Sequence, residues 1–76
     1  MTIISWLYAY KKSNEFTWED LSRLTGMSPK SLRRRLDYEV SISHTQMFDI
    51  VNAMAKLTNV NKRILLMKML KETGRL

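Results

Sequence analysis

Apolar residues recur every three or four positions along much of the chain, which is the spacing of an amphipathic helix. The clearest case follows Ser43, where Ser43 and Gln46 have the spacing of a capping box at a helix start. The apolar face that follows consists of Met47, Ile50, Val51, Met54 and Leu57. This pattern predicts a helix that begins at Ser43, packs one face on a core and ends at the polar break 58–61.

Two further helices are predicted at the ends of the chain. Residues 2 to 13 place Ile3, Leu7 and Tyr10 on one stripe, and Trp6 lies four positions before Tyr10, so the two rings can pair. Asn61 is a suitable N-cap for a last helix from about 62 to 73.

Residues 17 to 37 have the pattern of two short helices joined by a tight turn. Thr17 is a suitable N-cap for the first, and Gly26 lies where that helix must end, because glycine adopts a positive φ without steric cost. Ser28 followed by Pro29 then indicates a second helix start, since proline is tolerated in the first turn. The pattern predicts a helix-turn-helix.

The second helix of this pair separates leucines from cations. At about 100° per residue, Leu32 and Leu36 fall on one side, and Lys30, Arg33 and Arg34 fall roughly opposite. Between Leu21 and Leu36 there are five basic residues and no acidic one. Cations at this density repel one another, so a polyanionic partner is favoured over the alternative of a solvated helix face.

Composition narrows the fold and the partner. Seventy-six residues suffice for one domain, spanning 1–76, and two glycines and one proline fit few loops. We therefore expect an all-α fold, a compact five-helix bundle. The net charge of +6 and pI of about 10.0 favour an acidic partner such as nucleic acid. No apolar run approaches the ~20 residues that span a bilayer, so no membrane partner is expected, although an interfacial helix at residues 1–10 is an alternative.

The last predicted helix carries more apolar residues than one core-facing side can hold. The surplus predicts a partner surface, most simply a second copy, because two-fold dimers are the commonest oligomers. The alternative is a central helix buried on all sides. The residues predicted to form the dimer interface are Leu65, Leu66, Met69 and Leu70.

Residues 17 to 57 resemble the phage repressor/Cro (XRE-type) helix-turn-helix family. The resemblance rests on Leu21-Ser22-x-Leu24-Thr25-Gly26-Met27-Ser28 around the turn, and on the capped segment SISHTQMFDIVNAM that follows. It implies a lambda repressor-like domain that inserts residues 28 to 36 into the major groove of DNA. Where the family often carries Asn-Gly after this helix, the chain has Asp37-Tyr38-Glu39, whose charges would repel DNA.

The resemblance implies a role for each cation and hydroxyl of the motif. Lys30, Arg33 and Arg34 match base-facing positions, and arginine bound to guanine is the commonest specific base contact. The expected contacts with the DNA backbone are Ser28, Ser31, Arg35, Arg23, Thr17, Trp18, Ser41, Ser43, His44 and Thr45. The predicted function is a sequence-specific double-stranded DNA-binding transcriptional regulator, a repressor that binds an inverted-repeat operator as a homodimer.

Two other functions fit the same pattern. The apolar last helix and the acidic loop favour a protein-interaction module, such as an antirepressor or antitoxin that binds another regulatory protein. A DNA-bending excision or architectural factor is the other. Catalysis is not expected, because His44 is the only histidine, the carboxylates are scattered and no glycine-rich phosphate loop is present. We expect no cofactor, no metal and a cytoplasmic location in a bacterial or phage-infected cell.

Overall fold

The computed structural model describes residues 1–38 and 41–76, and these two ranges contain five helices and no strand. The all-α prediction is therefore confirmed for this part of the chain. None of the described helices is long and apolar enough to cross a membrane. The helices are α1 (Ile3–Ser13), α2 (Trp18–Thr25), α3 (Pro29–Asp37), α4 (His44–Thr58) and α5 (Lys62–Glu72).

Local hydrogen bonds explain where the helices begin and end. The Thr17 hydroxyl accepts from the Asp20 N–H at 3.0 Å, and the Ser28 hydroxyl accepts from the Ser31 N–H at 3.1 Å. Gly26 ends α2 with φ 76°, a left-handed conformation that favours glycine. The predicted starts at Ser43 and Asn61 are confirmed by caps of the same kind, and Ser43 and Gln46 form the complete capping box.

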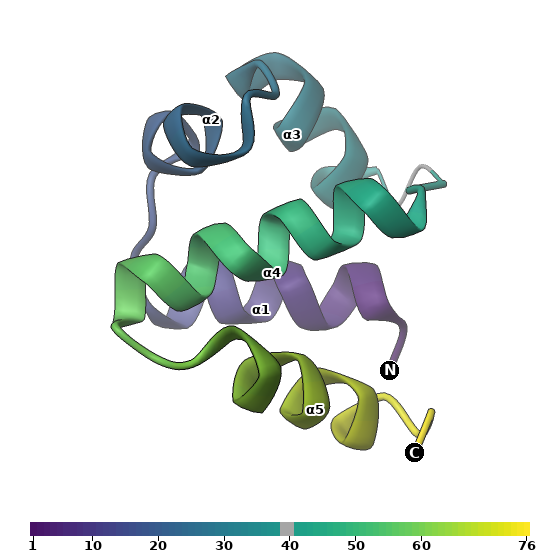
Figure 1. Cartoon of the computed structure of the whole chain (residues 1–76). Coiled ribbons are helices and arrows are strands. Elements are labelled where there is room, and N and C mark those ends of the chain that lie inside the picture. Colours follow the sequence, from purple (N-terminus) through teal and green to yellow (C-terminus); the bar gives the residue numbers. More distant parts are fainter. Residues whose placement is uncertain (39–40) are drawn as a thin grey trace.

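The described helices are arranged in three layers. Figure 1 shows α2 and α3 at one end, α5 at the other, and α1 and α4 between them. The contacts agree, because α3 packs on α2 and α1, whereas α5 packs on α4 and α1. The core is formed by leucines, methionines and an isoleucine that lie almost entirely out of contact with solvent: Leu7, Leu21, Leu32, Ile50, Met54, Leu65 and Met69.

Aromatic residues close the core beside α1. The rings of Trp6 and Tyr10 stack, with centroids 5.0 Å apart and planes at 9°, which confirms the predicted pairing one turn apart. Phe16, just before the cap of α2, is buried and its ring lies 6.0 Å from that of Tyr10. These contacts fix the direction in which the chain enters α2, and so help to place α3.

The burial pattern of α5 corrects the predicted dimer interface. Leu65 and Met69 are 2% and 0% exposed and belong to the core of the single chain, so their assignment to an interface between copies was wrong. Leu66 and Leu70 are only partly buried against that core. The apolar residues that α5 exposes are Ile64 and Met67, at 64% and 53%. The predicted surplus of apolar residues on α5 therefore exists, but its exposed members are Ile64 and Met67 and not Leu65 and Met69.

Candidate nucleic-acid interface

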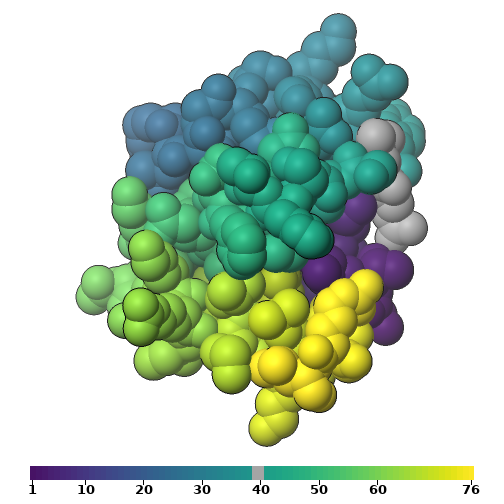
Figure 2. Space-filling model, turned by 45° about the vertical axis from the view of Figure 1, so that its right-hand side comes forward, coloured from purple at the N-terminus to yellow at the C-terminus, as the bar shows by residue number. Residues whose placement is uncertain are grey.

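Two buried leucines fix the rotation of α3 about its axis. Leu32 and Leu36 are 0% and 2% exposed, which turns the opposite side of the helix to solvent. Lys30, Arg33 and Arg34 are all exposed, as the helical spacing predicted. Figure 2 shows side chains from this end of the molecule, coloured blue to teal, standing clear of the surface. The arginines are turned outward, which a readout of DNA by this helix requires.

The three exposed cations of α3 differ in what they contact. The Arg33 Nε donates to the Asp37 Oδ2 at 3.0 Å, one turn further along the same helix. Within residues 1–38 and 41–76, neither Lys30 nor Arg34 forms an ion pair. Because they are four positions apart, Lys30 and Arg34 share one side of α3. They are therefore the cations of α3 most available to an external anion.

An open hollow lies along this side of α3. Its lining residues are Ser28, Lys30, Ser31, Arg34 and Arg35. Among the described residues, the lining holds three cations and two serine side chains and no carboxylate. The Ser28 hydroxyl caps α3, and no acidic residue lies in the first turn of that helix. A surface of this composition suits a phosphate or the edge of a base, because both present hydrogen-bond acceptors.

Arg35 is anchored to the protein itself. Arg35 is half-buried, and its Nη1 donates to the Ser41 carbonyl at 2.7 Å. The Arg35 Nε is buried and has no hydrogen-bond partner in the part of the chain that the structure describes. This contact ties the end of α3 to the segment that leads into α4. Arg35 was predicted from the sequence to contact the DNA backbone. Its hydrogen bond to Ser41 could not be predicted, because it depends on where Ser41 lies relative to α3.

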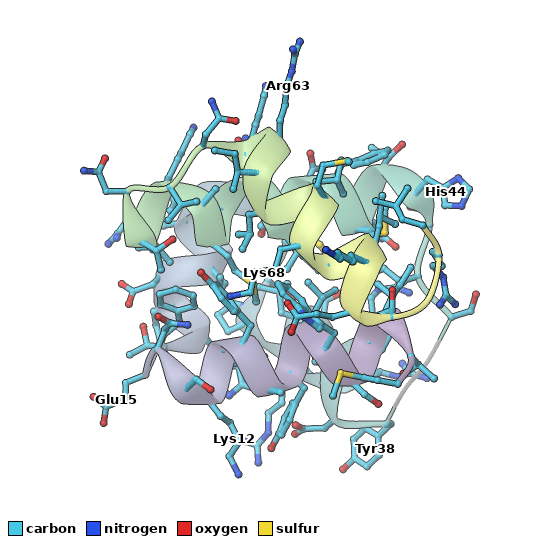
Figure 3. All side chains as sticks on the ribbon, turned by 90° about the horizontal axis from the view of Figure 1, so that it is seen from below. Lys12, Glu15, Tyr38, His44, Arg63 and Lys68 are labelled. Atoms are coloured by element: carbon cyan, nitrogen blue, oxygen red, sulfur yellow. The ribbon has the colours of Figure 1, made fainter. Side chains whose placement is uncertain are left out.

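The start of α4 lies next to this tie and exposes four of the predicted backbone contacts. Ser41, Ser43, His44 and Thr45 are all exposed. Figure 3 shows His44 pointing outward from the end of the helix. No acidic residue lies in the first turn of α4, so the partial positive charge of the helix N-terminus is not cancelled there. An anion such as phosphate is favoured at such an end.

The start of α2 is less favourable for an anion than the sequence suggested. The exposed Thr17 is held in a capping box with Asp20, and Arg23 pairs with the same carboxylate at 3.4 Å. Hydrogen bonding from the Thr17 side chain and then from its backbone N–H lowers the pKa of Asp20, so this residue is ionised at neutral pH. Glu19 adds a second acidic residue to the same turn. The predicted backbone contacts at Thr17 and Arg23 thus lie beside carboxylates.

One cation that the sequence did not single out lies beside α2. The Lys11 Nζ stands 4.1 Å from the centroid of the Trp18 ring, in a cation–π contact. Trp18, a predicted backbone contact, is half-buried, so its ring is in part covered by Lys11 and the core. No spacing rule brings residue 11 to residue 18, because the contact depends on how α1 packs against the start of α2.

The described residues hold no group of three or more His, Asp or Glu side chains arranged to bind a metal ion. Comparisons with protein-family models, with curated proteins and with solved structures gave no match.

Proposed function

We propose that the chain is a transcriptional regulator that binds duplex DNA by placing α3 in the major groove. One observation supports this proposal most strongly. Lys30 and Arg34 are exposed, lie on one side of α3 and form no ion pair with the described residues, and none of the described residues that line the hollow beside them is a carboxylate. Two cations one helical turn apart repel each other, and an anionic partner would remove that repulsion. An α-helix fits the major groove, where guanine offers two acceptors to arginine.

Base reading is assigned to Lys30 and Arg34, and Arg33 takes a smaller part. Arg34 is exposed, lies opposite the buried leucines and is the best candidate for a bidentate bond to guanine O6 and N7. Arg33 would have to exchange its bond with Asp37 for one with DNA. The carboxylate of Asp37 also repels phosphate on that side of α3.

Contacts with the DNA backbone are assigned mainly to the α4 side of α3. Ser28 and Ser31 line the hollow, and the exposed start of α4 offers a helix N-terminus with no acidic residue in its first turn. Phosphate contacts of this kind set the register of the protein without reading sequence. The start of α2, with Glu19 and Asp20, contributes less on the other side.

The predicted homodimer on an inverted repeat requires an interface other than the outer face of α5. The helices α3 and α5 lie at opposite ends of the molecule (Figure 1). A two-fold axis through the outer face of α5 would point the two copies of α3 away from each other. It could not place them one helical turn of DNA, about 34 Å, apart on one side of a duplex. An interface close to α3 is needed, and repression would then follow from blocking access to a promoter.

A comparison of two double variants with the same net charge tests the proposal. Lys30→Gln with Arg34→Gln should weaken binding to a mixed-sequence duplex at least about tenfold at ~0.1 M salt, because two phosphate or base contacts are lost. Lys12→Gln with Lys68→Gln removes two exposed cations outside this face and should change binding less than about threefold. Equal weakening by both variants would mean that only net charge matters, and would contradict the proposal.

A further inference from the structure

A groove between α4 and α5 lies outside the proposed DNA interface. Its apolar lining is formed by Phe48, Val51 and Leu66, with Asp49 and Asn52 on the α4 side and Lys62 and Arg63 on the α5 side. Phe48 is 50% exposed although it is a large apolar residue. Exposed apolar residues gathered beside a groove are typical of a binding surface.

Helix α5 exposes two further apolar residues. Ile64 and Met67 are three positions apart, so they share one side of this helix, and both are more than half exposed. Neither contributes to the core, where α5 is held by Leu65 and Met69. Because Leu66 and Leu70 also pack in part against the core, α5 is held without Ile64 and Met67, and folding gives no reason for exposing these two.

The charges around this surface indicate the net charge expected of its partner. Helix α5 carries four cations, Lys62, Arg63, Lys68 and Lys71, and a single carboxylate, Glu72. All four cations are exposed, and Figure 3 shows Arg63 projecting away from the protein at the start of the helix. A second copy would bring two such rims together and they would repel. An acidic partner would be attracted.

We propose that this groove binds an acidic amphipathic helix of another protein. Apolar side chains of that helix would lie against Phe48, Val51 and Leu66, and its Asp or Glu residues would pair with Lys62 and Arg63. A lipid surface fits less well, because the apolar lining is recessed between two helices and a flat bilayer surface would not reach into it.

The two proposed surfaces can be occupied together. The groove lies between α4 and α5, and α5 is at the end of the molecule opposite α3 (Figure 1). A partner bound there would leave Lys30 and Arg34 open to DNA. The proposal for the groove does not depend on DNA binding, since the two surfaces share no residue and are measured with different ligands.

A peptide selection on the intact chain tests the proposal. The pool displays helical peptides of about 16 residues with leucine or phenylalanine fixed along one face, and with each polar position free to be Glu or Lys. The expected result is enrichment of Glu at the positions that flank the apolar face. The best peptide should bind with a Kd of about 10 μM or tighter. Its NMR shift changes should centre on residues 48–52 and 62–67.

Charge reversal then locates the contact. Lys62→Glu with Arg63→Glu should weaken the selected peptide at least about tenfold, whereas Lys12→Glu, on the exposed side of α1, should leave it unchanged. Both variants change exposed residues, and circular dichroism checks that they stay folded. A pool that yields no binder, enrichment of Lys, or shift changes centred on α3 would overturn the proposal. So would self-association through Phe48 and Met67, or binding to vesicles of anionic lipid that Phe48→Ser abolishes.

Discussion

The Arg33 Nε donates to the Asp37 Oδ2 at 3.0 Å, and this single contact separates two neighbouring arginines that look equivalent in the sequence. Arg33 lies beside a carboxylate, whereas Arg34 forms no ion pair with any described residue. The pair itself adds little stability, about 0.2–0.5 kcal/mol for a surface contact one helical turn apart. The pair matters for binding, because it leaves Lys30 and Arg34 as the exposed cations of α3 that form no ion pair with a described residue.

Arg34→Ala should weaken binding to a preferred duplex more than Arg33→Ala does. Loss of a bidentate contact with guanine costs about 1–3 kcal/mol, so a drop of roughly 10- to 100-fold is expected for Arg34. The loss for Arg33 should stay below about fivefold, because its free-state bond with Asp37 offsets part of any contact with DNA. Fluorescence anisotropy titrations with a labelled duplex measure both. An equal loss for the two variants would show that the pair with Asp37 has no influence.

Asp37→Asn should tighten DNA binding. The substitution releases Arg33 and removes a negative charge from the side of α3 that faces a phosphate backbone in the proposed complex. An increase in affinity of about two- to tenfold is expected at low salt, and it should shrink as salt rises. Glu72→Gln, at the far end of the molecule, makes the same change in net charge and is the matched control. Equal tightening by both would trace the effect to net charge alone.

Arg35→Ala should lower both stability and affinity. Removing the bond between Nη1 and the Ser41 carbonyl is expected to cost about 1 kcal/mol in the free energy of unfolding. Binding should weaken for all DNA sequences alike, with a salt slope flatter by about one, if the remaining guanidinium nitrogen contacts a phosphate. Urea unfolding and salt-dependent titrations separate the two effects. A loss confined to one base position would instead assign Arg35 to base reading.

The capping box of α2 predicts a dependence of stability on pH. Hydrogen bonds from Thr17 lower the pKa of Asp20 in the folded chain below its ordinary value of 3.8. The ionised form thus stabilises the fold above that value, and the contribution is lost as the pH falls through the folded pKa. Asp20→Asn should therefore reduce the decline of the melting temperature between about pH 5 and pH 2. An unchanged decline in Asp20→Asn would contradict this origin of the pH dependence.

Local patterns predicted most of the fold. The caps at Thr17, Ser28, Ser43 and Asn61 and the turn at Gly26 depend on residues within four positions, and all five are where the sequence placed them. The pair of helices predicted within residues 17 to 37 ends at Asp37, the last residue of α3, and of the segment Asp37-Tyr38-Glu39 the last residue lies outside the described ranges. These features could be predicted because helix ends are governed by short-range hydrogen bonds.

Contacts between distant residues could not be predicted in the same way. The sequence did not show which apolar residues of α5 turn inward, because that choice depends on how α5 packs on α1 and α4. The tie of Arg35 to Ser41 and the position of Lys11 over Trp18 have the same origin. The pair of Arg33 with Asp37 was within reach, since the two residues are one turn apart. From charge alone, Arg33 was expected to contact a base and Asp37 to repel DNA.

Selection of bound sites from a pool of random duplexes tests the assignment of α3 most directly, when it is run in parallel with the unchanged chain, Arg34→Ala and Arg33→Ala. The account predicts that the unchanged chain enriches a defined motif containing guanine. Arg34→Ala should lose the preference at one position of that motif, and Arg33→Ala should retain it. Failure to enrich any motif, or the same motif from Arg34→Ala as from the unchanged chain, would contradict the reading of DNA by this helix.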